Sequence, residues 1–210
     1  MKTRLATAVL ALAVCAPAPA AHAGEKLFTI DGGWYDMTNA SNSAKATFDG
    51  ASGGFAGGLA LEYGLSETLF LRAGGRFFSK SGERVFVDET TGEIFPLGHP
   101  VDVKIYPIYA LFGYRFLQGA RLRPYIAAGG GATIYAEESE IAGEIIEFSA
   151  TKPMGMAVAG ADYGRGRLRF GIEAGYSMVP NTIGTGGVSA FYDEDDVGGF
   201  TAVGRISFAF

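Results

Sequence analysis

The chain has little of what catalytic and metal-binding proteins commonly use. Its 210 residues include one cysteine and two histidines, and the cysteine, Cys15, lies in a leader-like N-terminal segment. A disulfide framework and cysteine-based metal sites are therefore excluded for the rest of the chain. Basic residues are few as well, with 17 lysines and arginines against 22 acidic residues. This balance argues against nucleic acid as a partner, because nucleic-acid-binding surfaces carry a basic excess.

Long hydrophobic runs are absent too, although hydrophobic residues are not. After the leader-like segment, no stretch reaches the roughly 18 apolar residues of a membrane-spanning helix. Even so, 48% of the residues are hydrophobic and 32 are glycine. Glycine at this density suits helices poorly, whereas a small β-barrel has a crowded interior that favours small residues. The composition therefore favours a membrane β-barrel.

The first 23 residues are predicted to be a secretory signal peptide. Lys2 and Arg4 form a basic start, and residues 5–13 form an apolar segment that is too short to span a membrane as a helix. Ala21-His22-Ala23 has the small-x-small pattern of a cleavage site. The pattern predicts export from the cytoplasm.

Cleavage would leave one domain, residues 24–210, with 15 basic and 22 acidic residues. This segment has an ordinary length for a single domain. Lipidation of Cys15 is the alternative to cleavage at Ala23. It is disfavoured because Val14 is bulkier than the small residue that usually precedes a lipidated cysteine.

Residues 200–210 alternate with a period of two. One face carries Phe200, Ala202, Gly204, Ile206, Phe208 and Phe210. The other face carries Thr201, Val203, Arg205, Ser207 and Ala209. Because side chains alternate across a strand, one side is wholly apolar and the other is mixed. An apolar outward face and a polar inward face are typical of a β-barrel in a membrane.

Eight runs along the chain read as strands. They cover about residues 26–36, 54–64, 68–79, 101–116, 123–136, 153–163, 168–179 and 200–210. Short connections follow the even runs and long ones follow the odd runs, as in outer-membrane barrels. The sequence therefore predicts an all-β fold, an eight-stranded antiparallel up-and-down transmembrane β-barrel. Its short turns and both chain ends should face the periplasm, and its four long loops should face outward.

Several segments resemble the small OmpA/OmpX-type outer-membrane barrels, including the opacity-protein and porin-like domains grouped with them. The resemblance is carried by residues 61–66, 123–131, 161–164 and 204–210. It implies a location in the outer membrane of a Gram-negative bacterium, among lipid and lipopolysaccharide. It also implies that the barrel-assembly machinery reads a C-terminal signal, here Gly204, Ile206, Phe208 and Phe210. The family includes adhesins, complement-resistance factors and structural anchors, so the resemblance is weak for function.

The first candidate site is the barrel interior. Alternation places eight charged residues on inward faces: Glu62, Arg72, Arg76, Arg115, Asp162, Arg169, Glu173 and Arg205. Buried charges must be paired, so we expect a packed salt-bridge network along the axis. A barrel of this size has room for side chains but not for an open pore. The network is therefore interpreted as a structural plug, with a narrow gated path for small ions as the alternative.

The second candidate site is the outer loops. One acidic run comprises Asp193, Glu194, Asp195 and Asp196, and residues 137–147 carry five glutamates. Such oxygen-rich clusters can bind calcium or magnesium, but no EF-hand spacing is present, and solvated loop charge is the favoured interpretation.

Val85-Phe86-Val87 and Ile94-Phe95 flank a turn and predict a hairpin above the membrane, and residues 145–148 hint at a second one. Exposed hairpin tips can grip a host surface or a partner strand.

Signals for an enzyme are poor, and no cofactor is expected. The exported segment has one histidine, His99, and Val101 stands where outer-membrane lipid A deacylases have serine. No catalytic triad can be assembled.

We therefore expect a monomeric outer-membrane protein that acts in surface interaction, adhesion or envelope structure, with a small-solute or ion channel as the alternative. A soluble lipocalin-like carrier is disfavoured because lipocalins bury apolar residues inside, whereas this inner face carries Arg72, Glu173 and Arg205.

Overall fold

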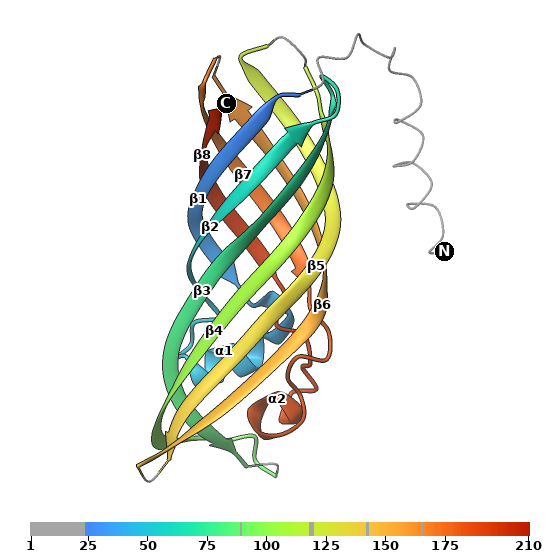
Figure 1. Cartoon of the computed structure of the whole chain (residues 1–210). Coiled ribbons are helices and arrows are strands. Elements are labelled where there is room, and N and C mark those ends of the chain that lie inside the picture. The colour runs from blue at the N-terminus through green and yellow to red at the C-terminus, as the bar shows by residue number, and fades with distance from the viewer. Residues whose placement is uncertain (1–23, 89, 118–119, 142, 165) are drawn as a thin grey trace, which may run out of the picture.

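The protein forms one closed barrel of eight antiparallel strands in chain order, with β1 pairing β8 (Figure 1). The computed structural model describes residues 24–88, 90–117, 120–141, 143–164 and 166–210, so the predicted signal peptide lies outside the described residues. The strands are β1 (Lys26–Asp36), β2 (Gly53–Gly64), β3 (Leu69–Val87), β4 (Ile94–Arg115), β5 (Leu122–Ile141), β6 (Glu144–Tyr163), β7 (Leu168–Met178) and β8 (Phe200–Ala209). The predicted fold class is confirmed.

The barrel wall is apolar on its outer face, and the charged side chains of the strands point inward. On β8, Ile206 and Phe208 face outward and are 41% and 44% exposed. Arg205, which directly precedes Ile206, faces inward and is 3% exposed. Tyr63 and Tyr163 also face outward, and the adjoining Glu62 and Asp162 are buried. A water-soluble barrel would have the opposite pattern, so this wall suits contact with lipid.

The two ends of the barrel differ in their connections. Short turns join β2 to β3, β4 to β5 and β6 to β7, and the start of β1 and the end of β8 lie at the same end (Figure 1). We call this the periplasmic end and the opposite one the outer end. The prediction of four long outer connections is only partly correct. The connections from β1 to β2 and from β7 to β8 are long, whereas short turns join β3 to β4 and β5 to β6 at the ends of strands that are longer than predicted.

Four strands continue beyond the barrel as a protruding sheet, defined as residues 79–87 of β3, 94–104 of β4, 131–141 of β5 and 144–154 of β6. The predicted loops at 80–100 and 137–152 are therefore mostly strand, which corrects their boundaries. The predicted hairpin is confirmed, since Phe86 pairs with Phe95. In the second hairpin, Ser139 pairs with Ile146. Strand pairing continues through both charged segments, so they extend the strands.

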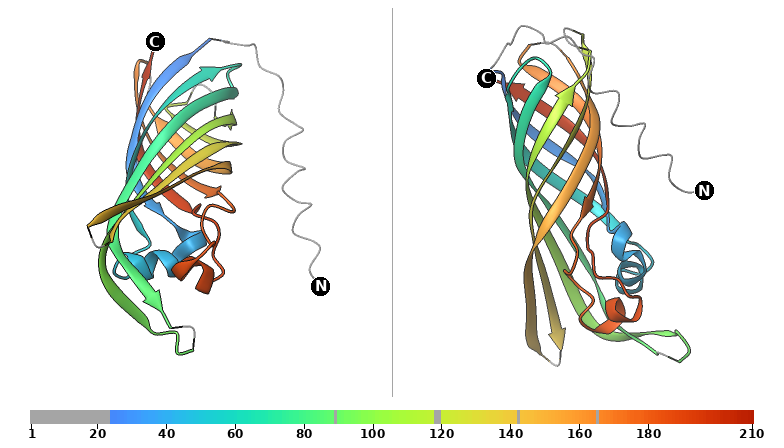
Figure 2. Two further views of the ribbon diagram at one scale, coloured as in Figure 1. Left: turned by 60° about the horizontal axis from the view of Figure 1, so that its bottom comes forward. Right: turned by 90° about the vertical axis from the view of Figure 1, so that its right-hand side faces the viewer.

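The other two outer connections fold over the mouth. They contain η2 (Thr38–Ala40), α1 (Ser41–Thr47) and α2 (Gly187–Phe191), which the sequence did not predict. Figure 2 shows both α-helices beside the concave face of the protruding sheet. None of the helices among the described residues is long and apolar enough to cross a membrane.

Candidate functional site

Glu173 of β7 is the centre of an ion-pair network inside the barrel. Its Oε2 accepts hydrogen bonds from Arg72 Nη1 at 2.5 Å and from the Tyr125 hydroxyl at 2.7 Å. Its Oε1 accepts one from Arg76 Nη2 at 2.6 Å. Arg205 Nη1 lies 3.4 Å from Oε2. Because β3 and β7 are on opposite sides of the ring, these contacts tie opposite walls together.

Two more carboxylates balance the arginines of β3. Glu62 Oε2 accepts hydrogen bonds from Arg72 Nε and Nη2 at 3.0 and 2.9 Å, and Glu62 Oε1 accepts one from Arg115. Asp31 Oδ1 accepts one from Arg76 Nε at 3.1 Å. All of these side chains are buried. Pairing offsets the cost of taking a charge out of water, so every charge in this layer depends on its neighbours.

The remaining two predicted charges have other partners. Asp162 Oδ1 lies 3.6 Å from Arg205 Nη1. Arg169 donates to both carboxylate oxygens of Glu25, which precedes β1 at the periplasmic end. Burial raises the pKa of Glu25, but the hydrogen bond and charge of Arg169, together with the charges of Arg123 and Arg115, outweigh burial and hold this pKa below its ordinary value. Arg169 therefore closes the network at the rim of the barrel.

Inward-facing glycines make room for these contacts. Gly58 of β2 lies between Asp31 and Arg76 in the strand register. A Cβ atom at Gly58 would lie 2.5 Å from Arg76 Cγ and 2.9 Å from Asp31 Oδ1. Gly160 of β6 likewise lies between Tyr125 and Glu173 in the strand register. A Cβ atom at Gly160 would lie 2.5 Å from the hydroxyl oxygen of Tyr125. Glycine on an intervening strand thus lets side chains from the strands beside it meet.

The charge network does not run the full length of the axis, contrary to the prediction. Toward the outer end the interior is filled by buried apolar side chains, among them Tyr35, Phe78, Ile105, Met154, Met156 and Val179. Tyr35 and Phe78 pack edge to face with ring centroids 5.1 Å apart. The interior is therefore divided into a charged periplasmic half and an apolar outer half.

Three residues of the network were missed from the sequence. Asp31 and Tyr125 lie on inward faces by the same alternation that identified the others, so the pattern already contained their signal. Glu25 lies outside the regular strand and is found only through the contact with Arg169. No periodicity indicates a partner of that kind.

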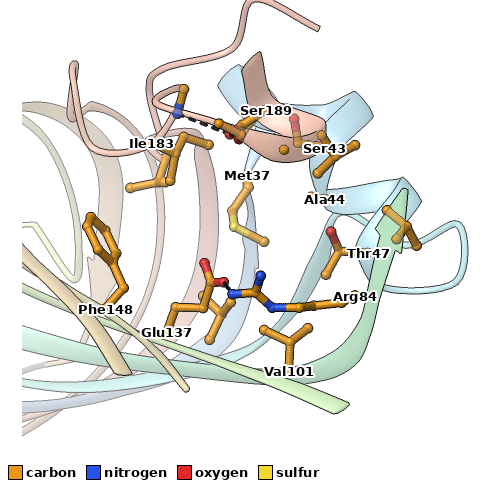
Figure 3. Close-up of a pocket in the computed structure, with 18 of the residues that line it drawn as sticks. Met37, Ser43, Ala44, Thr47, Arg84, Val101, Glu137, Phe148, Ile183 and Ser189 are labelled. Carbon is orange, nitrogen blue, oxygen red and sulfur yellow. Dashed lines mark hydrogen bonds and ion pairs between the residues drawn. The ribbon is translucent and has the colours of Figure 1, made fainter. Parts of the chain in front are cut away.

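A second candidate site lies at the outer end, between the protruding sheet and the helices over the mouth. It is a cavity of about 450 Å³, which we call the outer cavity (Figure 3). Met37, Ala44 and Val101 line it from three different parts of the chain. One ion pair crosses its wall, from Arg84 Nη2 to Glu137 Oε1 at 3.2 Å. The lining of the outer cavity thus combines apolar side chains with one ion pair and with the hydroxyl groups of Ser43, Thr47, Thr185 and Ser189.

The acidic run of the fourth outer loop organises the loop itself. Glu194 accepts hydrogen bonds from the backbone N–H groups of Asn42 and Ser43 at 3.0 and 2.8 Å, which fastens α1 to this loop. Asp195 and Asp196 accept backbone N–H groups of residues 181 and 179. Within the described ranges, no three His, Cys, Asp or Glu side chains are grouped so that they would hold a metal ion. The structure therefore offers no support for the cation site at residues 193–196.

Asp88 has a similar local role at the tip of the first hairpin. Its Oδ1 accepts the backbone N–H groups of Thr91 at 3.0 Å and Thr90 at 2.7 Å. These hydrogen bonds lower the pKa of Asp88. The carboxylate stabilises the turn in the manner usual for aspartate in this position.

The residues of the predicted assembly signal share the outward face of the last strand. Ile206, Phe208 and Phe210 are exposed there, and Gly204 lies on the same face. The structure thus displays these side chains on the wall that suits lipid.

No protein-family model matches the chain, and a search of curated proteins finds no match. Solved structures do resemble it. A major outer membrane protein of Thermus thermophilus is 13% identical with a TM-score of 0.58, and the match covers 90% of this chain and 100% of that one. The chain has the fold of the small eight-stranded outer-membrane barrels.

Two further structures agree with this fold. Neisserial surface protein A (NspA) is 13% identical with a TM-score of 0.55, covering 89% of this chain and 97% of that one. The outer membrane protein OprG of Pseudomonas aeruginosa is 13% identical with a TM-score of 0.55, covering 90% and 96%. Together with the apolar wall, these likenesses support the predicted location in a bacterial outer membrane.

Proposed function

We propose that this outer-membrane barrel acts in surface interaction, through the free edge of its protruding sheet. The observation that carries the proposal is the outer edge of β6, which pairs with no other strand of the described residues beyond Gly155. Strand β7 pairs with β6 only as far as Gly155, so residues 144–154 extend beyond it with their outer edge open. An open edge presents backbone N–H and C=O groups to which an extended segment of another protein can add as a strand.

The chemistry of this edge favours a basic, extended partner segment. Ile145 beside the tip is 64% exposed, and Ile146 and Phe148 are exposed as well. Residues 137–152 carry five glutamates and one lysine. Apolar contacts would supply affinity, and the acidic charge would select for lysine or arginine in the incoming strand.

The barrel interior supports a binding role over a channel. Four arginines and three carboxylates are interlocked across its axis, and the apolar layer lies above them. Opening a path for ions would require these buried pairs to separate, which is costly. In this proposal, lipid and lipopolysaccharide surround the wall, and the protein is a monomer without a catalytic step.

The test is peptide binding to the protein in lipid nanodiscs. A decapeptide of alternating lysine and valine should bind, whereas a glutamate–valine decapeptide and a backbone N-methylated lysine–valine decapeptide should not. Glu147→Lys should weaken binding by about tenfold, since like charges repel across an interface. The matched control is Glu93→Lys at the tip of the other hairpin, which should bind as the wild type does.

Two results would contradict the proposal. Equal binding of the N-methylated peptide would show that no strand is added at the edge. A sustained conductance of the wild-type protein in a planar bilayer would favour the narrow channel instead.

A further inference from the structure

The outer cavity is larger than a packing defect. Protein interiors contain few voids larger than a water molecule, whereas this one measures about 450 Å³. Pockets that hold small organic molecules span roughly 300–1,000 Å³. The size of the outer cavity therefore matches a small-molecule site.

Its walls come from four parts of the chain that are distant in sequence. Met37 precedes the first helical segment, Phe48 follows α1, Val101 belongs to β4, and Val197 follows the fourth loop. All four side chains are buried and apolar. In the view of Figure 3, Arg84 lies between Met37 and Val101. The four buried apolar side chains belong to the apolar part of the lining, which a bound molecule can contact.

The charged spot in the lining is fixed and has no net charge. Arg84 Nε donates to Ser139 Oγ at 2.8 Å, and Arg84 Nη2 lies 3.2 Å from Glu137 Oε1. The Tyr135 hydroxyl donates to Glu137 Oε2 at 2.9 Å. Because arginine and glutamate balance each other, the spot suits a neutral group that forms one hydrogen bond. A charged ligand would leave one partner of the pair uncompensated.

The wall opposite the sheet is thin, which gives a route of entry. Residues 184–187 line the cavity and include three glycines, and neither Gly186 nor Gly187 has another atom within 4 Å of its Cβ position. Glycine contributes no side chain to block passage there. Open space thus lies beside this part of the wall, next to α2, where a molecule from the outer medium can approach.

We propose that the outer cavity binds a small, neutral, mainly apolar molecule from the outer medium. Its apolar body would contact Met37, Phe48 and Val101, and its single hydrogen-bonding group would meet Arg84 and Glu137. This site is on the concave side of the protruding sheet and does not use the free edge of β6. It is therefore independent of the surface-interaction proposal.

The first experiment uses 2-naphthol as the probe and the whole folded protein in lipid nanodiscs. Equilibrium dialysis against empty nanodiscs of the same lipid separates binding to the protein from partition into lipid. We expect one saturable site. Ala44→Trp fills the cavity and should weaken binding by about tenfold or more. Ala190→Trp adds the same ring to the exposed side of α2 and should leave binding unchanged.

The second experiment tests the charged spot. Wild-type protein should bind 2-naphthol about fivefold more tightly than 2-methylnaphthalene, which is similar in shape but has no hydroxyl, since one hydrogen bond supplies this difference. Arg84→Met should remove the preference and retain binding of 2-methylnaphthalene. This variant also tests the proposal if Ala44→Trp fails to fold, as judged by loss of the heat-dependent shift in gel mobility.

Three results would overturn the proposal. Uptake equal to that of empty nanodiscs would show that the protein binds no such molecule. Folded Ala44→Trp binding as tightly as wild type, or Ala190→Trp weakening binding equally, would place the probe outside the cavity. The lysine–valine decapeptide should still bind to Ala44→Trp. This measurement distinguishes failure of the cavity proposal from failure of the surface-interaction proposal.

Discussion

The two halves of the barrel interior are built from the same alternating strands but are stabilised in different ways. In the periplasmic half, Glu173 and Arg72 are parts of a network that joins β3, β5, β7 and β8. In the outer half, Phe78, Ile105 and Met156 are buried among apolar neighbours. Each half fills its cross-section with buried side chains.

The two halves differ in whether their stability depends on charge or on side-chain volume. An ion pair in a buried layer needs every partner, because removing one leaves a charge without compensation. An apolar layer needs mainly the correct volume, and substitutions that conserve volume are well tolerated. We therefore expect the charged half to be sensitive to changes that leave shape intact and the apolar half to tolerate them.

The largest effect is expected from Glu173→Gln. Glutamine keeps the shape of the side chain but leaves Arg72 and Arg76 without their shared carboxylate, which should lower the free energy of unfolding by about 3–5 kcal/mol. Urea unfolding in lipid vesicles measures this change. The control is Glu138→Gln in the exposed pair with Lys104, for which the expected loss is below about 1 kcal/mol. Equal losses for the two variants would show that burial does not control the cost.

A smaller effect is expected from Met156→Leu in the apolar half. The two side chains have similar volume, so the free energy of unfolding should fall by less than about 1.5 kcal/mol. The same urea titration in vesicles provides the measurement. If Met156→Leu lowered the free energy of unfolding as much as Glu173→Gln does, the contrast between the halves would be wrong. The apolar half would then depend on side-chain shape as strongly as the charged half depends on charge.

The sequence predicted which side chains enter the barrel, but not how they pair. Alternation alone indicates that Glu62, Arg72 and Glu173 point inward. The contact between Arg76 and Glu173 crosses the ring, and it depends on strand stagger and tilt, which no local pattern specifies. The room that Gly58 provides likewise becomes evident only from the register.

The outer end was predictable only where its strands continue. The hairpin through Phe86 and Phe95 follows from local residue preferences. Helix α1, in contrast, has seven residues, and its first turn is fastened by Glu194 from a loop far along the chain. Such a short helix is not stable from its own sequence. The outer cavity exists because these distant segments meet, so it has no signal in the sequence.

The smallest effect is expected at the periplasmic rim, where Glu25 and Arg169 close the charged half. Arg169 holds the pKa of Glu25 below its ordinary value against the opposing effect of burial. A lowered pKa in the folded state stabilises the fold above the pKa of the unfolded chain, and this stability is lost as the pH falls through the folded pKa. Thermal unfolding in detergent should therefore show a difference in Tm between wild type and Glu25→Gln at pH 7 that shrinks as the pH is lowered below about 4. Glu93→Gln, in the exposed turn of the first hairpin, should show little difference at any pH. A difference for Glu25→Gln that persists unchanged under acid conditions would mean that the carboxylate charge does not act at the rim, and that only the interior pairs around Glu173 hold the charged half together.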